Sequence, residues 1–243
     1  MSFSDRIDHV IVLMLENRSF DQMLGDYQNY GREEFATLDG IDAASPIECQ
    51  DNDGFSYRQL PKASRVVSPD PPHELDSVLR QLGLPIPELP TPPNWLEGDR
   101  LARFLTTIQK IAESYGAGQM SRAAAASAID VLDPANFINE YAEHGGAKTQ
   151  RERQEVLNYF RRGSLPALHA LADNFLICDH WFSSVPGPTW ANRFFVHSGT
   201  SCGVARMAEN ATDYWGYDVY NQDTIFDRMS DKGIPWRIYF GDI

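Results

Sequence analysis

A run of six apolar residues at positions 10–15 constrains the fold most, because it stops abruptly at two polar residues, Glu16 and Asn17. An unbroken apolar run of this length is typical of a central strand that is buried on both faces. Ser19, with a glutamine three residues later, has the form of a capping box that begins a helix. The sequence therefore predicts a buried strand, a turn at Glu16 and Asn17, and a helix from Ser19 to about residue 25.

Glu16 and Asn17 carry oxygen atoms of the kind that divalent cations prefer as ligands. They follow a strand directly, and open α/β sheets keep their sites at the carboxyl ends of strands. Neighbouring residues within a strand point to opposite faces, so both side chains reach one ion only if the chain is already turning. The alternative is a solvent-exposed glutamate beside a turn-forming asparagine, since this pair alone is common.

A second constraining stretch lies far downstream and ends at Thr189. Residues 175–178 form a short apolar run of strand length, and the loop at 185–188 contains two prolines and a glycine. Thr189 then begins a segment with apolar residues at helical spacing. A hydroxyl at the start of a helix lies beside unpaired N–H groups that stabilise a phosphoryl group under attack, although Thr189 as an ordinary helix cap is the alternative.

Together, ENRSFD at 16–21 and SVPGPTWANR at 184–193 resemble motifs of the phosphoesterase family that contains bacterial phospholipases C of the phosphatidylcholine type and a related acid phosphatase. The resemblance covers residues 7–25, 70–75 and 158–203. It implies an α/β fold, an alkaline-phosphatase-like sandwich with a central, mostly parallel sheet. It also implies hydrolysis of a phosphate ester with the help of one divalent metal ion.

Site residues carry over from this resemblance position by position. Glu16 and Asn17 match metal ligands of the family, and Thr189 matches the hydroxyl nucleophile, which also contacts the metal. His73, after Asp70 and two prolines, resembles a histidine that faces the phosphate or the leaving group. Ala191 stands where the family usually has proline, a mild change because both residues suit the first turn of a helix.

The family completes its metal site with an acidic pair and further histidines that follow a stretch like residues 233–240, and this sequence stops at residue 243. Two interpretations remain open: the C-terminally incomplete part of a longer enzyme, or an impaired homologue that acts as a binding or regulatory protein. A sulfatase-like esterase is a third, which Thr189 disfavours because such enzymes use a modified Cys or Ser. The substrate is a phosphate ester, either a phospholipid or another diester or monoester.

Composition limits the partners. The net charge is -13, which argues against nucleic acid as a partner, and 42% of the residues are hydrophobic, as in a globular domain. Three widely separated cysteines have no metal-like spacing, and Cys178 is expected to be a buried thiol. We expect no signal peptide and no membrane-spanning segment, hence a cytoplasmic location by default with export by another route open.

Between the two motif stretches, the sequence predicts one α/β domain over residues 1–243 with a helical insertion at 83–133. A short hairpin is expected at 55–67, within long connections rich in Asp, Gly, Ser and Pro. Further helices are expected at 134–141, at 149–172 with a break near Gly163, and at 224–232, and a last strand at 236–240.

Overall fold

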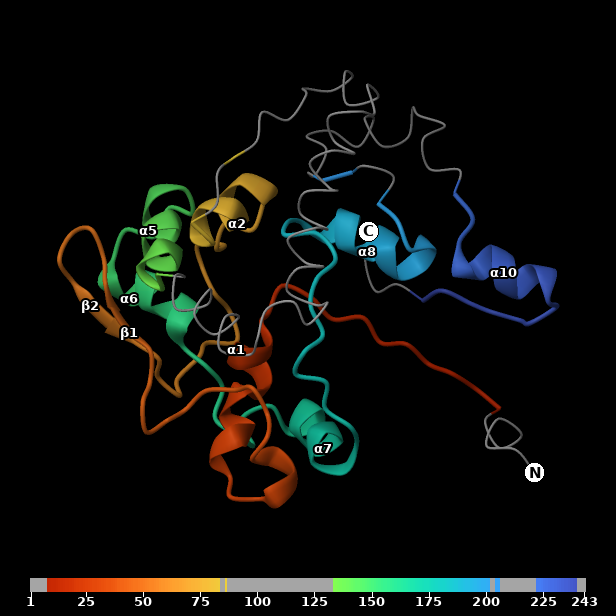
Figure 1. Cartoon of the computed structure of the whole chain (residues 1–243), viewed down its shortest axis with the longest axis horizontal. Helices are drawn as coiled ribbons and strands as arrows, with labels where there is room; N and C mark the ends of the chain where they lie inside the picture. The colour runs from red at the N-terminus through yellow and green to blue at the C-terminus, as the bar shows by residue number, and fades with distance from the viewer. Residues whose placement is uncertain (1–7, 84–85, 87–132, 202–203, 206–221, 240–243) are drawn as a thin grey trace, which may run out of the picture.

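We describe the protein from a computed structural model, which defines residues 8–83, 86, 133–201, 204–205 and 222–239. In this part of the chain, short helices are accompanied by one small antiparallel sheet, which lies at the left edge of the molecule in Figure 1. The α-helices are α1 (Phe20–Leu24), α2 (Leu75–Gln81), α5 (Ala135–Glu143), α6 (Gln150–Gln154), α7 (Pro166–Asn174), α8 (Thr189–Ser198) and α10 (Ile225–Asp231). The 3-10 helices are η2 (Gly25–Asn29), η3 (Glu33–Phe35) and η5 (Glu155–Leu157), and the strands are β1 (Glu48–Gln50) and β2 (Ser56–Arg58).

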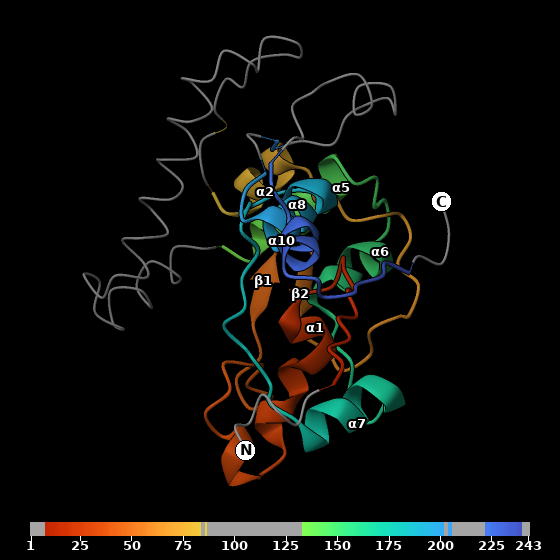
Figure 2. The same cartoon turned by 90° about the vertical axis from the view of Figure 1, so that its right-hand side faces the viewer.

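Separate apolar clusters hold the helices together. Tyr27 of η2 packs on Phe35 of η3 and Ala172 of α7, while Val185 packs on Ala191 of α8. Helix α2 packs on α5, and each helix buries apolar side chains, so α2 lies fixed on α5 at one end of the molecule (Figure 2). These contacts position the segment before α2, which carries His73, and the start of α8, which is Thr189.

The helices confirm most of the predicted starts. Helix α1 begins after Ser19, whose hydroxyl accepts a hydrogen bond from the Gln22 N–H at 3.1 Å. The Gln22 side chain, however, accepts from the Arg18 guanidinium at 2.9 Å, so the second half of the expected capping box has a different partner. Helix α5 begins behind Asp133, which accepts from the Ala135 N–H, and α10 begins at a complete capping box. Capping side chains thus determine where these helices begin.

The predicted hairpin exists, but it begins earlier than expected. Strands β1 and β2 pair antiparallel with Cys49 opposite Tyr57, so the hairpin spans 48–58 rather than 55–67. The turn is built around Asp51, whose carboxylate is fully buried and accepts from the N–H groups of Asp53 and Phe55. The same carboxylate accepts from the Tyr57 hydroxyl at 2.7 Å and from Arg153 of α6 at 2.8 Å. Asp51 therefore fastens the hairpin to α6.

Substitution of Asp51 by Asn is expected to destabilise the fold by about 2–3 kcal/mol, because Arg153 loses its buried partner. Burial raises the Asp51 pKa, but hydrogen bonds from Tyr57, Phe55 and Arg153 outweigh it and hold the pKa below its usual value. A lowered pKa in the folded state stabilises the protein above the unfolded value of about 3.9, and this stabilisation is lost as the pH falls through the folded value. Urea unfolding of the parent protein and of Asp51→Asn, at neutral and at acidic pH, measures the difference in the free energy of unfolding.

The matched control is Asp53→Asn, because Asp53 also binds Arg153, at 2.6 Å, but its side chain is 57% exposed. We expect this change to cost less than about 1 kcal/mol. Equal losses for the two variants, or a D51N difference that persists unchanged at acidic pH, would contradict the assignment of the stabilisation to the buried Asp51 carboxylate.

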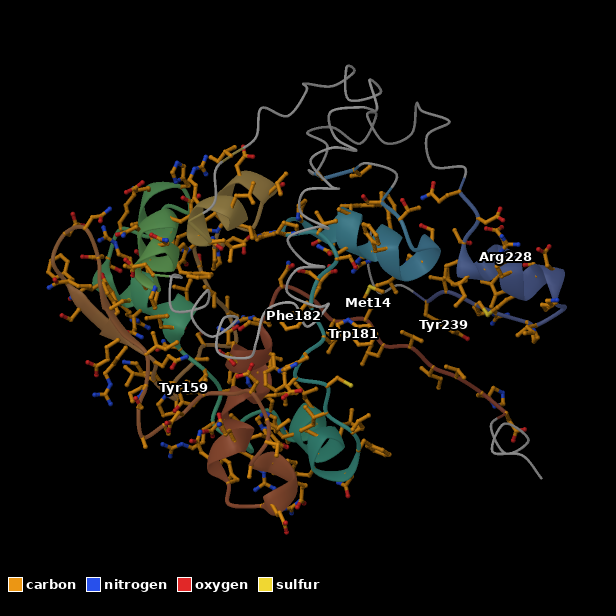
Figure 3. All side chains as sticks on the ribbon, in the orientation of Figure 1. Met14, Tyr159, Trp181, Phe182, Arg228 and Tyr239 are labelled. Atoms are coloured by element: carbon orange, nitrogen blue, oxygen red, sulfur yellow. The ribbon has the colours of Figure 1, made fainter. Side chains whose placement is uncertain are left out.

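The described structure does not show the strands predicted at residues 10–15, 175–178 and 236–240. None of the three segments forms a strand within the residues that the structure defines, and the last is described only to residue 239. Val10 is 81% exposed, Ile11 91% and Leu176 89%, instead of buried. Figure 3 shows Met14 and Tyr239 on two of these segments, and Trp181 and Phe182 shortly after the third, all outside the helices and the sheet. An apolar extended segment is buried only when a neighbouring strand pairs with it, and the described part of the chain supplies no such partner.

Other expectations have mixed outcomes. The Cys178 thiol is exposed rather than buried, because its segment is not covered by a sheet. The insertion at 83–133 lies almost entirely outside the described residues. Among the described residues, no helix is both long enough and apolar enough to cross a membrane.

Candidate functional site

The site begins with a sharp turn at Asn17. Asn17 has a φ of 67°, and it is the one residue other than glycine with a positive φ in the described part of the chain. Asparagine tolerates this left-handed conformation better than most residues, because its short polar side chain bonds locally. The turn lies between the extended segment 10–15 and α1, so it is where the sequence predicted the chain to change direction.

The second part of the site is the loop before α8, which Asn192 holds in place. Its side-chain amide donates to the carbonyl oxygens of Val185 at 3.0 Å, Gly187 at 3.1 Å and Pro188 at 3.2 Å. Its amide oxygen accepts from the Val185 N–H at 3.0 Å. One side chain thus ties the loop to the first turn of α8, and Thr189 is the residue at which this loop becomes helix.

Thr189 does not cap α8. The N-cap is Pro188, and no side-chain hydrogen bond caps this helix. The Thr189 hydroxyl lies 3.5 Å from the Asn17 amide oxygen, a contact that joins residues 172 positions apart in the sequence. The alternative interpretation of Thr189 as an ordinary helix cap is therefore wrong, and its hydroxyl stands at the helix N-terminus facing the Asn17 turn.

Arg193 connects Glu16 to the same helix. Its Nε donates to Glu16 Oε2 at 2.8 Å and its Nη2 donates to Glu16 Oε1 at 2.9 Å, a bidentate ion pair. Arg193 lies four residues after Thr189, so the two side chains share one face of α8. The bidentate ion pair fixes the plane of the Glu16 carboxylate. Helix α8 therefore carries Thr189 and, through Arg193, also orients Glu16. Sequence reasoning assigned no role to Arg193.

These oxygen atoms suit a divalent cation in part. A cation bound to two neighbouring ligands at about 2.1–2.4 Å separates those ligands by about 3.0–3.4 Å, close to the 3.5 Å between Thr189 and Asn17. The carboxylate of Glu16 has about four lone-pair positions, and Arg193 uses only two. Among the described residues, no group of three or more His, Cys, Asp or Glu side chains could hold a metal ion. Glu16, Asn17 and Thr189 therefore offer oxygen atoms to a cation, but fewer than a tight site needs.

His73 lies at the end of a proline-fixed segment just before α2. Its Nδ1 is 2.9 Å from the Pro71 carbonyl oxygen, which can only accept, so Nδ1 carries the hydrogen and Nε2 is left free to accept in the neutral ring. Leu75, at the start of α2, lies against Gly187 of the loop before Thr189: a Cβ on Gly187 would be 3.4 Å from the Leu75 Cα. The segment that carries His73 and the loop that leads to Thr189 are thus packed together.

The remaining histidines have other environments. His169 is buried and accepts at Nδ1 from the Gly163 N–H at 2.6 Å, as a structural residue would. His180 is 3.4 Å from the exposed Asp39 carboxylate. His197 stacks near the Phe226 ring, and burial, followed by the charge of Arg193, lowers its pKa. None of the three contacts Thr189 in the described structure.

Comparison with known proteins identifies the family. The model of the Phosphoesterase family matches residues 7–243, nearly the whole sequence. The chain belongs to the Phosphoesterase family. The match confirms the resemblance that the two motif stretches indicated, and it brings Glu16, Asn17, His73 and Thr189 within one family region.

Several relatives of this phosphoesterase are phospholipases C. The chain is 28% identical over 238 residues to non-specific phospholipase C4 of Arabidopsis thaliana, which covers 96% of this chain and 36% of the relative. It is 31% identical over 99 residues to hemolytic phospholipase C of Pseudomonas aeruginosa, which covers 35% of this chain and 13% of the relative. The chain spans about a third of the length of the plant relatives that it matches.

Proposed function

We propose that this phosphoesterase hydrolyses phosphate esters through a covalent phospho-threonine at Thr189, with one divalent metal ion held by Glu16, Asn17 and Thr189. The observation that carries the proposal is the approach of the Thr189 hydroxyl to Asn17 at the start of α8, opposite the Arg193–Glu16 pair. Two distant motifs meet there around a hydroxyl that has no capping role.

The reaction uses the residues in sequence. The Thr189 hydroxyl loses its proton to solvent water and its oxygen attacks phosphorus in line, the bond to the alcohol breaks, and a phospho-threonine forms. The N-terminus of α8, with the positive end of its helix dipole, would face the charge that spreads over the phosphoryl oxygens. The protonated His73 ring donates its Nε2 proton to the leaving alcohol oxygen, and the resulting neutral ring takes a proton at Nε2 from the water that hydrolyses the intermediate.

A bound divalent ion would supply a lower pKa for the Thr189 hydroxyl and charge compensation for the phosphoryl group. Glu16, Asn17 and Thr189 would hold it, together with ligands that the described residues do not include. Arg193 would keep the Glu16 carboxylate aimed at the ion while leaving its outer lone pairs free.

We further propose that the extended apolar segments pair as strands of an alkaline-phosphatase-like sheet. Their exposure supports this, since Ile11 and Leu176 expose 91% and 89% of their surface and such side chains are normally covered. In that fold Glu16 and Asn17 would follow the carboxyl end of a central strand, where α/β sheets place their sites.

The proposed substrate is a phosphate ester such as a phospholipid, as the names of the relatives suggest. A cytoplasmic location, with export as the alternative, stays a prediction. An impaired homologue that binds without turnover is the second candidate, favoured by the single carboxylate of the ligand set and by its ion pair with Arg193.

Turnover of two matched esters tests this function and the role of His73. The p-nitrophenyl ester releases p-nitrophenolate, which leaves without being protonated. The corresponding benzyl ester releases benzyl alcohol, which must receive a proton as it leaves. We expect His73→Gln to lower kcat for the benzyl ester by about 10²–10⁴-fold and for the p-nitrophenyl ester by much less, as loss of a general acid predicts. His144→Gln, a change at a half-exposed histidine just after α5, is the control.

The parent protein is assayed with divalent metal ions added and again after their removal by a chelator. Failure to hydrolyse either ester under any metal condition would favour the impaired homologue. If His73→Gln lowered kcat equally for both esters, the parent protein would still be a phosphoesterase, but His73 would not be the proton donor.

A further inference from the structure

A cavity of about 480 Å³ lies away from Thr189, among η2, β2 and the segment that follows η5. Its lining includes Asp26, Tyr30, Arg58, Tyr159 and Arg161. This volume lies within the range of about 300–1,000 Å³ that is typical of small-molecule sites. The reaction proposed for Thr189 uses none of these residues.

The buried side chain in this cavity has an unused polar group. Tyr159 is 4% exposed, and its hydroxyl makes no hydrogen bond within the described part of the chain. Its hydroxyl is not one of the fully buried polar atoms that lack a partner, so it opens into the cavity that Tyr159 lines and can donate a hydrogen bond there. Burial raises the pKa of Tyr159, the Asp26 carboxylate raises it further, and the charges of Arg161 and Arg58 lower it. Three charged groups therefore act on this one hydroxyl.

The two arginines are available to a ligand. The Arg161 guanidinium has neither an ion pair nor a hydrogen bond among the described residues, and Arg58 is 4.0 Å from an exposed Glu48 carboxylate. The one carboxylate in the lining, Asp26, is already engaged: it accepts from the Arg162 N–H at 2.8 Å and from the Asn29 amide at 3.2 Å. Spare positive charge thus exceeds spare negative charge at the cavity.

Backbone hydrogen bonds fix the segment that carries Tyr159 and Arg161. The Tyr159 N–H donates to the Leu60 carbonyl at 2.9 Å, and its carbonyl accepts from the Ala63 N–H at 3.1 Å. The next N–H, of Phe160, donates to the Gln22 carbonyl of α1 at 2.8 Å. Figure 3 shows Tyr159 beside α1, consistent with this anchoring. The cavity wall is therefore ordered before any ligand arrives, which lowers the cost of binding.

We propose that this cavity binds a small phosphorylated anion, with Arg58 and Arg161 on the phosphate oxygens and the Tyr159 hydroxyl as a third donor. Planar guanidinium groups match phosphate oxygens in bidentate geometry, and the phenol supplies a hydrogen bond that nothing else in the cavity satisfies. The remaining acceptor capacity of Asp26 fits a ligand that also carries a hydroxyl group. Glycerol 3-phosphate has this chemistry, whether free or as the head of an anionic phospholipid. The proposal does not rest on the reaction at Thr189.

Calorimetric titration of the chelator-treated protein with glycerol 3-phosphate tests the site. Arg161→Gln and Arg58→Gln are each expected to weaken binding by about tenfold or more, as the loss of a charged hydrogen-bond donor predicts. Tyr159→Phe is expected to weaken it about threefold. Arg228→Gln is the control: Arg228 is an exposed arginine on α10, far from Tyr159 (Figure 3), and we expect no change beyond about twofold.

Two results would overturn the proposal. One is the absence of measurable binding of glycerol 3-phosphate and of inorganic phosphate to the folded parent protein. The other is binding that Arg193→Gln abolishes while Arg161→Gln and Arg58→Gln retain it, which would place the ligand at Thr189. Because Arg58 and Arg161 are exposed, both variants are expected to fold, and circular dichroism checks this.

A vesicle-binding experiment distinguishes a lipid headgroup from a free phosphate ester as the ligand. Flotation with phosphatidylcholine vesicles that contain phosphatidic acid is compared with flotation with pure phosphatidylcholine vesicles. Binding that requires phosphatidic acid and is lost in Arg161→Gln would identify a lipid headgroup. Binding of glycerol 3-phosphate without vesicle binding would identify a free ester, and both results agree with the site.

Discussion

Substitution of Thr189 by Ala is expected to abolish hydrolysis of a p-nitrophenyl phosphate ester, with a fall in kcat of more than about 10³-fold. The hydroxyl is the nucleophile of the proposed reaction, and without it no covalent intermediate forms. Since Thr189 makes no capping hydrogen bond in α8, the change should leave the free energy of unfolding nearly unaltered. Steady-state kinetics and urea unfolding of the same preparation measure both quantities.

Thr189→Ser is the matched control, because it keeps a hydroxyl at the start of α8 and removes only a methyl group. We expect it to retain turnover within about tenfold of the parent, which a variant without a nucleophile cannot do. Turnover by Thr189→Ala within tenfold of the parent would show that another group attacks phosphorus.

Substitution of Glu16 by Gln is expected to weaken binding of a divalent cation by more than about 100-fold, beyond the 10–100-fold typical when only a supporting residue is changed. Glu16 is the one carboxylate of the ligand set formed with Asn17 and Thr189, so its loss removes the negative charge that the cation requires. Calorimetric titration of chelator-treated protein with Mn²⁺ and Zn²⁺ measures this without reference to turnover. Full metal stoichiometry at unchanged affinity in Glu16→Gln would remove Glu16 from the ligand set.

The same titration separates two roles for Arg193. If Arg193 positions the Glu16 carboxylate, Arg193→Gln weakens cation binding by about 10–100-fold, while Arg193→Lys, which keeps the charge but not the fork, recovers only part of it. Tighter cation binding by Arg193→Gln would show instead that Arg193 competes with the cation for Glu16.

Local signals in the sequence predicted helix starts well and strand partners poorly. Ser19 and Thr224 each cap a helix at an expected start, because capping depends on residues only a few positions apart, whereas the N-cap of α5 is Pro134 rather than the expected Asp133. The apolar run at 10–15 is exposed in the described structure, because a strand also requires a partner from elsewhere. The hairpin begins earlier than predicted because Asp51, rather than the later polar residues, holds its turn.

The sequence analysis predicted the principal residues of the candidate site but not the residues that support them. The motifs placed Glu16, Asn17 and Thr189 at one site, and the structure brings these side chains together, although their roles stay predictions. Arg193 had a usable signal, since a residue four positions after Thr189 shares its helix face. The loop contacts of Asn192 had none, because they depend on the folded backbone of residues 185–188.

The most direct measurement is mass spectrometry of the protein after rapid acid quench during turnover of a p-nitrophenyl phosphate ester. The proposed mechanism predicts one phosphate on the peptide that contains Thr189, present in the parent and absent from Thr189→Ala. Phosphate on a different residue, or turnover in which no phosphorylated peptide accumulates even under single-turnover conditions at several quench times, would contradict a covalent phospho-threonine.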